Sequence, residues 1–499
     1  MTLMFSFLSI EFAICFIVFY IAYWLCQRHI HLQNALLMLF SYLCIYLMSN
    51  MYAVGLLLIY SLSIYAASYA LDRFHKYKTW IVRLAVIVTL LQLSVFKYFD
   101  FFKTQTDQVL HALHADSAWL WSDLIMPLGL SYYSFQSISY LVDRAKQNIP
   151  LPRLSCLQAC TYFSLLFTIT AGPIARVYEA KGLTAVDGES SAMGRQLNSI
   201  HPRQVVYPGF ALFLILLALI KKWWIASWIA TQWVNPVFQN PLQYQSFEVL
   251  AAIYGYTLQL FLDFSGYSEL MLGFALLLGF KLPVNFRAPL LAYNIRDFWD
   301  RWHISLSTWI RDYIYIPLGG SRGSLARTQA HLLLAMVLSG IWHGAGWGFV
   351  IWGALHGFAL ILLNLTDLLA HRLGVKDRRN ALANTGRLGH VIGRVVTVHF
   401  VCLAFIFFQA KTLTDANEIF QALAFNMFDV PLTTNPFYML SLLLLAWIIY
   451  PFIYQRLGQP NVIYSFKLTP RSFVPLFIVF VVVLICSPSG IPGFIYANF

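Results

Sequence analysis

Long apolar stretches constrain the fold of this chain more than any other feature. They run at about 8–26, 34–50, 52–71, 80–101, 118–142, 207–232, 246–280, 329–369, 389–410, 437–455 and 472–490 of the 499 residues. Apolar residues make up 59% of the chain and charged residues only 11%, whereas soluble domains carry roughly 25% charged residues. Since a spanning helix needs about 20 residues, we predict an all-α polytopic membrane protein with about 11–12 membrane helices. The composition excludes a DNA-binding protein.

Three segments do not fit a simple count of one helix per apolar stretch. Residues 159–173 are too short to span a bilayer, and residues 246–280 are too long and are interrupted by Asp263-Phe-Ser-Gly266. Residues 329–369 are interrupted by the glycine-rich run 340–348. Irregular backbone at membrane depth is tolerated only where protein or a water-filled cavity covers it. We therefore expect re-entrant or broken helices at these three places.

The distribution of charge sets the expected orientation. The chain carries 33 Lys and Arg against 21 Asp and Glu, and residues 281–327 hold seven basic residues against three acidic ones. Residues 233–245 hold no charged residue at all. Because basic loops stay in the cytoplasm, we expect both termini on the outer side of the membrane. The basic excess is then an orientation signal, and no nucleic-acid partner is predicted.

Nothing in the sequence divides the chain into separate domains. There is no internal repeat and no long flexible linker, so residues 1–499 are expected to form a single membrane domain.

The seven cysteines show no zinc-binding spacing, since Cys156 and Cys160 lack a second Cys/His pair. We predict no metal site and no bound cofactor.

The segment 294–320 places arginine, aspartate, tryptophan and histidine side chains between membrane segments. Its centre reads Arg301-Trp-His-Ile-Ser, with a further arginine at Arg311. Ionisable residues at such places face a cavity or each other, and they indicate a functional site. The alternative is an interfacial amphipathic helix whose Trp and Arg side chains lie at the lipid headgroups.

A second polar position lies in the glycine-rich run of 329–369. The apolar part that precedes His343 has only 13 residues, 329–341. At 1.5 Å per residue it extends about 20 Å, which is short of the roughly 30 Å of a hydrocarbon core. We therefore expect His343 at a break within the membrane, beside glycines that let a ligand approach the backbone. His356 is interpreted as a structural residue.

These motifs closely resemble those of the membrane-bound O-acyltransferases. Within that family they are similar to the bacterial branch that acylates cell-envelope polymers, which includes alginate and peptidoglycan O-acetylation subunits and the D-alanyl transfer subunit for teichoic acids. The core motifs lie within residues 127–370. The matching residues are Pro127–Gln136, Ala171–Ile174, Lys221-Lys222, Arg301–Tyr313, Ile316–Gly320 and Ile341–Ala345.

The resemblance implies a role for several residues and a fold with a central tunnel. It makes His343 the catalytic histidine and His303 the second essential polar residue. Acyl transfer from a thioester to a hydroxyl needs a base near neutral pH, for which imidazole is the usual group. The residues expected to bind the donor or line the tunnel are Arg301, Arg311, Trp302, Trp342, Tyr132 and Gln136.

The chain ends in Phe494-Ile-Tyr-Ala-Asn-Phe499. This ending resembles the aromatic motif of the envelope acyltransferase systems, in which the tyrosine, here Tyr496, carries the acyl group transiently. A phenol with a pKa near 10 forms an ester reactive enough to pass the group onward. The alternative is an aromatic anchor at the bilayer surface.

The expected function is the transfer of acetyl from cytoplasmic acetyl-CoA, the donor substrate, across a bacterial inner membrane to an envelope polysaccharide. Peptidoglycan is the preferred acceptor, followed by alginate or another exopolysaccharide. An extracytoplasmic esterase-like O-acetyltransferase is expected as partner, because the chain has no large soluble domain to hold a polymer. Two alternatives stay open: D-alanyl transfer from a carrier protein, and a transporter with broken helices.

Overall fold

The computed structural model of the protein describes residues 5–112, 126–146, 153–375, 386–457 and 469–487. The chain divides into two compact units. The first comprises the described residues of 1–212 and 271–283, and the second those of 213–270 and 284–499. Secondary structure in the described ranges is helical, with one isolated bridge between Thr184 and Ser190. The single-domain prediction for residues 1–499 stays a prediction.

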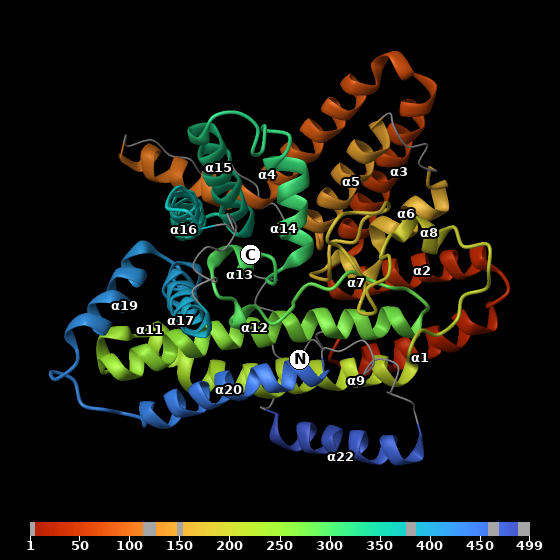
Figure 1. Ribbon diagram of the computed structural model, residues 1–499. Helices are drawn as coiled ribbons and strands as arrows, with labels where there is room; N and C mark the ends of the chain where they lie inside the picture. Colours follow the sequence, from red (N-terminus) through yellow and green to blue (C-terminus); the bar gives the residue numbers. More distant parts are fainter. Residues whose placement is uncertain (1–4, 113–125, 147–152, 376–385, 458–468, 488–499) are drawn as a thin grey trace. The chain divides into compact units, whose positions relative to one another are not determined.

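The first unit is built from the N-terminal helices of the chain (Figure 1). Side-chain caps fix several helix starts, since Ser9 accepts a hydrogen bond from the backbone of Phe12 and Asn50 from that of Ala53. The helices are α1 Ile10–Leu25, α2 Ile30–Met48, α3 Met51–Arg73, α4 Lys78–Ala112, α5 Leu130–Ala145, α6 Cys156–Ser164, α7 Leu166–Ile169 and α8 Met193–Leu197.

A buried arginine joins distant segments of the first unit. Arg203 donates hydrogen bonds to the Tyr23 hydroxyl at 3.1 Å and to Asn34 Oδ1 at 2.6 Å. Its guanidinium also lies 4.5 Å from the ring centre of Phe280. The Tyr23 hydroxyl in turn donates to the carbonyl of Leu278 at 3.0 Å. These partners offset part of the cost of burying the charge, although Nε of Arg203 has no hydrogen-bond partner among the described residues.

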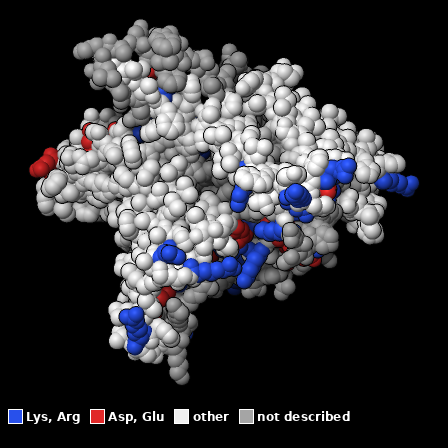
Figure 2. Space-filling model, turned by 90° about the horizontal axis from the view of Figure 1, so that it is seen from above, with Lys and Arg blue, Asp and Glu red and all other residues white. Residues whose placement is uncertain are grey.

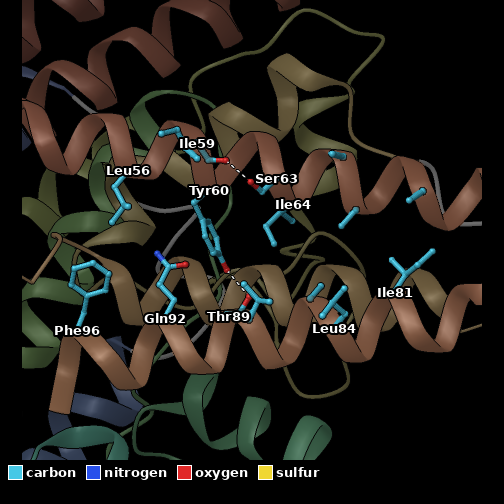
Figure 3. Close-up of a pocket in the computed structure, with 15 residues that line it drawn as sticks. Leu56, Ile59, Tyr60, Ser63, Ile64, Ile81, Leu84, Thr89, Gln92 and Phe96 are labelled. Atoms are coloured by element: carbon cyan, nitrogen blue, oxygen red, sulfur yellow. Dashed lines mark hydrogen bonds between the residues drawn. The ribbon is translucent and has the colours of Figure 1, made fainter. Parts of the chain in front are cut away.

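A groove of about 630 Å³ lies between α3 and α4 (Figure 3). Its lining is mainly aliphatic, from Leu56 to Ala70 on α3 and from Ile81 to Phe96 on α4. The Tyr60 hydroxyl lies 3.2 Å from Thr89 Oγ1 and also contacts Ser137. The groove contains none of the residues that the sequence assigns to the chemistry.

The second unit holds the C-terminal helices, while α9 and α12 each run through both units. Two π-helical segments, Leu219–Ala226 and Ala230–Val234, follow α9, and a third covers Arg311–Tyr315. The helices are α9 Pro208–Ala218, α10 Ser227–Ile229, α11 Asn235–Gln239, α12 Ser246–Leu277, α13 Ile295–Trp299, α14 Ile304–Ile310, α15 Leu325–His343, α16 Trp347–Arg372, α17 Arg387–Ala404, α18 Ile406–Gln409, α19 Leu413–Phe425, α20 Pro436–Leu457 and α22 Pro470–Cys486.

Glycines bring α15 and α16 close together as a helical hairpin (Figure 1). A side chain at Gly340 would come within 2.1 Å of the carbonyl oxygen of Phe349, and one at Gly353 within 2.5 Å of that of Met336. No Cβ atom fits at such distances from backbone. The hairpin therefore depends on small residues at the crossing, as helix pairs in membranes commonly do.

The structure confirms the prediction of an all-α polytopic membrane fold. Eight helices of the described residues are long and apolar enough to cross a membrane, and two shorter apolar helices lie at Ile10–Leu25 and Phe473–Cys486. Figure 2 shows the consequence on one face, where most of the surface is uncharged and Lys and Arg gather in a few clusters.

Two of the three expected irregularities are found. Residues 159–173 contain only α7 and part of the short helix α6, and the 329–369 segment breaks between His343 and Trp347. The expected break at Asp263–Gly266 is wrong, because α12 continues through it from Ser246 to Leu277. Asp263 forms an ion pair with Lys222 instead of disturbing the helix.

Candidate active site

His343 is the last residue of α15 and lies at the break of the helical hairpin. Its side chain is buried, with 2% of the residue exposed. The imidazole lies among three aromatic rings, with centroid distances of 4.8 Å to Trp342, 5.1 Å to Trp352 and 5.2 Å to Phe408. All three rings meet it at steep angles of 65° to 88°. Three aromatic rings therefore surround the imidazole at the helix break.

His303 precedes α14 and has a left-handed backbone conformation with φ of 43°. The N-terminal amides of α14 donate to Asn285, from Ile304 to its carbonyl oxygen and from Ser305 to its side chain. The His303 side chain therefore does not cap its own helix. It is 1% exposed and packs edge-on against Phe264 at 4.7 Å.

Trp342 brings the two predicted histidines into one site. Its indole centroid lies 4.8 Å from that of His343 and 6.3 Å from that of His303. The two imidazoles therefore contact the same aromatic side chain, although 39 residues separate them in sequence. The structure thus brings His343 and His303 to the same side chain, Trp342, while the cavity wall and the roles predicted for these residues stay predictions.

The two predicted donor-binding arginines each pair with an aspartate. Arg301 Nε donates to Asp297 Oδ1 at 2.7 Å, one helical turn away. Arg311 holds the neighbouring Asp312 with two hydrogen bonds, of 2.7 Å and 3.1 Å. Both arginine side chains stay partly exposed, at 29% and 39%. The aspartates therefore neutralise part of the charge of both arginines, while the guanidinium groups stay accessible to an anion.

The other predicted tunnel residues take different places. Trp302 is 1% exposed and lies in the apolar core of the second unit, stacked on Phe298 at 5.4 Å. Tyr132 and Gln136 lie on α5 in the first unit, and both are buried. The Gln136 amide donates to Thr168 Oγ1 at 3.0 Å. Tyr496 lies outside the described residues.

Sequence reasoning missed the aromatic cluster around His356. This histidine is fully buried, and its ring lies 4.7 Å from Trp352 and 5.2 Å from Trp299. Trp352 also contacts His343, so the cluster adjoins the predicted site. The signal was the sequence Trp352-Gly-Ala-Leu-His356, which places both rings on one helix face at i and i+4.

The part of the chain that contains this site matches a known protein family. Residues 190–408 match the family model of the membrane-bound O-acyltransferase family. This range includes His303, His343 and His356.

Three curated relatives represent different envelope polymers. The chain is 31% identical over 347 residues to the probable alginate O-acetylase of Pseudomonas aeruginosa, covering 69% of this chain and 60% of the relative. It is 30% identical over 376 residues to the peptidoglycan O-acetyltransferase of Helicobacter pylori, covering 69% and 64%. It is 28% identical over 307 residues to the teichoic acid D-alanyltransferase of Bacillus subtilis, covering 58% and 70%.

The chain thus spans less than two thirds of the length of the first two of these relatives. The family match coincides with the part of the chain that carries the break at His343, the shared tryptophan and His303. Residues 190–408 therefore resemble a domain of the membrane-bound O-acyltransferase family.

Proposed function

We propose that this protein is an O-acetyltransferase that moves an acetyl group from acetyl-CoA toward hydroxyl groups of a bacterial envelope polysaccharide. The observation that carries the proposal is the placement of His343. It is a buried imidazole at a helix break, enclosed by Trp342, Trp352 and Phe408, within the segment that matches an O-acyltransferase family.

The chemistry follows from what a neutral imidazole can do. His343 accepts the proton of an attacking hydroxyl, and the hydroxyl oxygen forms a bond to the thioester carbonyl carbon. The carbon–sulfur bond then breaks, and the protonated imidazole returns the proton to the leaving thiolate of coenzyme A. No proton is gained or lost overall, so one histidine suffices as base and acid. His303, whose ring lies near the same Trp342, orients the donor or the acceptor.

The donor and the acceptor meet from opposite sides of the membrane. Coenzyme A is bulky and highly charged, so its passage through the hydrocarbon core is costly. Transfer of the small acetyl group alone avoids this cost. We place coenzyme A on the cytoplasmic side, with Arg301 and Arg311 near its phosphates, because arginine suits anion binding. Tyr496 is the intermediate acceptor, and an extracytoplasmic esterase-like partner passes the group to the polymer.

The acceptor is an envelope polysaccharide on the extracytoplasmic side of the bacterial inner membrane, with peptidoglycan preferred and alginate next. The named activities of the relatives support both choices, since one is a probable alginate O-acetylase and another a peptidoglycan O-acetyltransferase.

A second candidate is D-alanyl transfer to teichoic acid. The chain covers 70% of the Bacillus subtilis D-alanyltransferase, a larger share than of the acetylases, although the identity is lower at 28%. The two candidates differ in the donor. Acetyl transfer uses acetyl-CoA, whereas this second candidate takes its aminoacyl group from a carrier-protein thioester.

Radiolabel transfer tests the proposal. Membranes that contain the protein are incubated with [14C]acetyl-CoA, and label is followed into protein and polymer. We expect His343→Ala to lower transfer by roughly 10²–10⁴-fold, the usual contribution of a general base. The matched control is His371→Ala, which alters an exposed histidine in the last turn of α16.

The outcomes separate the classes of function. Near-normal transfer by His343→Ala means that the active site lies elsewhere. If neither protein nor polymer gains label from acetyl-CoA, the acetyltransferase is rejected, and label from a D-alanyl carrier protein then selects the second candidate. A transporter gives neither result.

A further inference from the structure

A second group of polar atoms lies buried directly beside His343. Its centre is Trp352, whose ring lies 5.1 Å from His343 on one side and 4.7 Å from His356 on the other. Trp299 completes the group at 5.7 Å from Trp352 and 5.2 Å from His356. Trp352 is 1% exposed and His356 is fully buried. α13 and α16, which pack against each other, supply these three side chains.

The polar atoms of this group have no hydrogen-bond partner among the residues that the structure describes. These atoms are Nε1 of Trp352, Nε1 of Trp299 and both ring nitrogens of His356. Leaving a buried donor unsatisfied costs free energy, and native proteins keep such groups rarely and mostly for a reason connected with function. Three such side chains in mutual contact therefore point to a ligand.

The chemistry of the group identifies what it binds. An indole nitrogen only donates, and a neutral imidazole carries one donor and one acceptor. A molecule that satisfies both indoles must therefore present an acceptor, such as a carbonyl oxygen. The rings of Phe298 and Phe400 lie 6.2 Å and 5.3 Å from His356 and keep the surroundings apolar. Donors in apolar surroundings stabilise a developing negative charge more strongly than they do in water.

We propose that Trp352, with His356 and Trp299, binds the carbonyl oxygen of the acyl group and stabilises the oxyanion that forms on it. This proposal rests on the proposed function, because it names the oxygen-binding groups of that same reaction. The carbonyl oxygen lies one bond, about 1.2 Å, from the carbon under attack. An acyl group that reacts beside His343 therefore brings this oxygen close to the indole of Trp352, whose ring contacts that imidazole.

The step balances without a further reactant. As the acceptor oxygen bonds to the carbonyl carbon, the electron pair of the C=O double bond moves onto the carbonyl oxygen. The donors of Trp352, His356 and Trp299 hold that oxyanion by hydrogen bonds without transferring a proton. The double bond re-forms when the carbon–sulfur bond breaks, and the thiolate leaves.

Turnover by the full-length protein provides the first test. Trp352→Phe keeps an aromatic ring in place and removes the N–H donor. We expect kcat to fall by roughly 10²–10³-fold, as for the loss of an oxyanion-hole donor, while KM for acetyl-CoA rises by at most about 10-fold, the effect of the lost hydrogen bond to the bound carbonyl. Trp447→Phe is the matched control, because its indole donates to the carbonyl of Leu290 at 3.0 Å in the same unit. It is expected to lower stability slightly and to leave kcat unchanged.

Binding of two coenzyme A analogues provides a test that does not depend on activity. S-acetonyl-CoA carries a ketone oxygen near the position of the thioester carbonyl, and S-propyl-CoA differs only by lacking it. We expect the wild-type protein to bind the ketone about 3- to 10-fold more tightly, the effect of one or two net hydrogen bonds. Trp352→Phe should bring the two affinities to within about 2-fold, a loss of the hydrogen-bond contribution.

A second pair of variants covers the case in which Trp352→Phe does not fold. His356→Asn keeps an N–H donor, whereas His356→Phe fills the space without one. We expect His356→Asn to retain the preference for the ketone analogue and His356→Phe to lose it.

The outcomes distinguish a failure of this proposal from a failure of the proposed function. A wild-type protein that releases no coenzyme A from acetyl-CoA contradicts the proposed function. A wild-type protein that turns over acetyl-CoA but shows no preference for the ketone, or a preference that Trp352→Phe retains, overturns the oxyanion site alone.

Discussion

The imidazole of His303 stands perpendicular to the ring of Phe264, with their centroids 4.7 Å apart. Phe264 lies in the middle of α12, directly after Asp263, whose carboxylate pairs with Lys222. The backbone of His303 is left-handed, an uncommon conformation that costs free energy for residues other than glycine. His303 is therefore held in place by its surroundings, as expected for a side chain with a positioning role.

A substitution by asparagine separates the backbone role of His303 from that of its ring. Asparagine tolerates the left-handed conformation, so His303→Asn should fold with a melting temperature close to that of the wild type. Without the imidazole we expect acetyl transfer to fall at least about 10-fold, as for the loss of a positioned acid–base or hydrogen-bonding group. Alanine removes the ring and adds backbone strain, so His303→Ala should lose stability as well. Normal transfer by a folded His303→Asn protein would show that the ring only fills space.

The sequence predicted helix breaks at two glycine-containing motifs, and only one of the two interrupts its helix. The 329–369 segment breaks at Gly344 and Gly346 as predicted, because glycine loses the most backbone entropy in a helix and is a poor helix former. Asp263-Phe-Ser-Gly266 also combines a charge with a glycine, yet α12 is continuous. A side chain at Gly266 would come within 3.2 Å of the Ala218 carbonyl oxygen, so this glycine permits close helix packing.

The partner of Asp263 lies 41 residues away in sequence, at Lys222. Local sequence therefore does not show that the charge is neutralised. The pair is deeply buried, with 4% and 5% of the two side chains exposed. The sequence alone therefore does not distinguish a continuous helix such as α12 from a broken one such as 329–369, because the contact that neutralises Asp263 is long-range.

This buried ion pair gives a prediction for stability. Lys222→Met leaves the Asp263 carboxylate buried without its charge partner, and we expect a loss of about 3–5 kcal/mol in the free energy of unfolding. The double variant Lys222→Met with Asp263→Leu should recover most of it, because no charge then stays buried. Thermal unfolding in detergent measures both. Lys221→Met is the control, since the Lys221–Glu269 pair is more exposed, at 18% and 22%. An equal loss in the single and double variants would contradict this view of the pair.

Arg301 can be tested against its own aspartate. If Arg301 binds the phosphates of coenzyme A, Arg301→Ala raises KM for acetyl-CoA. Asp297→Asn removes the competing carboxylate at 2.7 Å, so it should leave KM unchanged or lower it. If the pair is only structural, both variants weaken the protein in the same way and KM stays normal. Michaelis constants measured on the two variants, with their melting temperatures, decide between these roles.

Each of the two predicted arginines has its aspartate partner close to it in the sequence. Asp297 precedes Arg301 by four residues, a spacing that allows contact on a helix. Asp312 directly follows Arg311, so only the chain distance, and not helix geometry, suggests that pair. By contrast, the contact of Trp342 with both His303 and His343 depends on how α14 and the α15–α16 hairpin pack. Only the tertiary structure gives that contact.

A cluster outside the membrane-spanning helices predicts how stability depends on pH. Lys281 Nζ lies 2.6 Å from both Asp187 and Glu189. Burial raises the pKa of Asp187, but the Lys281 ammonium and other hydrogen bonds outweigh it and hold the pKa below its ordinary 3.8. Burial lowers the pKa of Lys281, but the two carboxylates outweigh it and hold the pKa above its ordinary 10.5.

The sign follows from linkage. Asp187, with a lowered pKa, stabilises the fold above about pH 3.8 and loses this effect as the pH falls through the folded-state pKa. Lys281, with a raised pKa, stabilises below about pH 10.5 and loses this effect as the pH rises through its folded-state pKa. The difference in melting temperature between wild type and Asp187→Asn should therefore be constant near neutral pH and shrink below pH 3.8. A difference that changes between about pH 5 and 8 would contradict the assignment.

Tyr496 distinguishes a covalent relay from direct delivery of the donor. Tyr496→Phe keeps the aromatic ring and removes only the hydroxyl that would accept the acetyl group, so any loss of transfer is chemical. We expect it to abolish acetylation of the polymer. Acetyl transfer to added small hydroxyl compounds, with release of coenzyme A, should continue, since His343 is intact. The matched control is Tyr438→Phe, which alters an exposed tyrosine on α20. Mass spectrometry of the C-terminal peptide, after incubation with acetyl-CoA and no partner, should find acetyl on Tyr496 of the wild type, as an ester of a phenol whose pKa near 10 makes it reactive. A fully active Tyr496→Phe protein would remove the relay, and Tyr496 would then be an aromatic residue of the membrane interface.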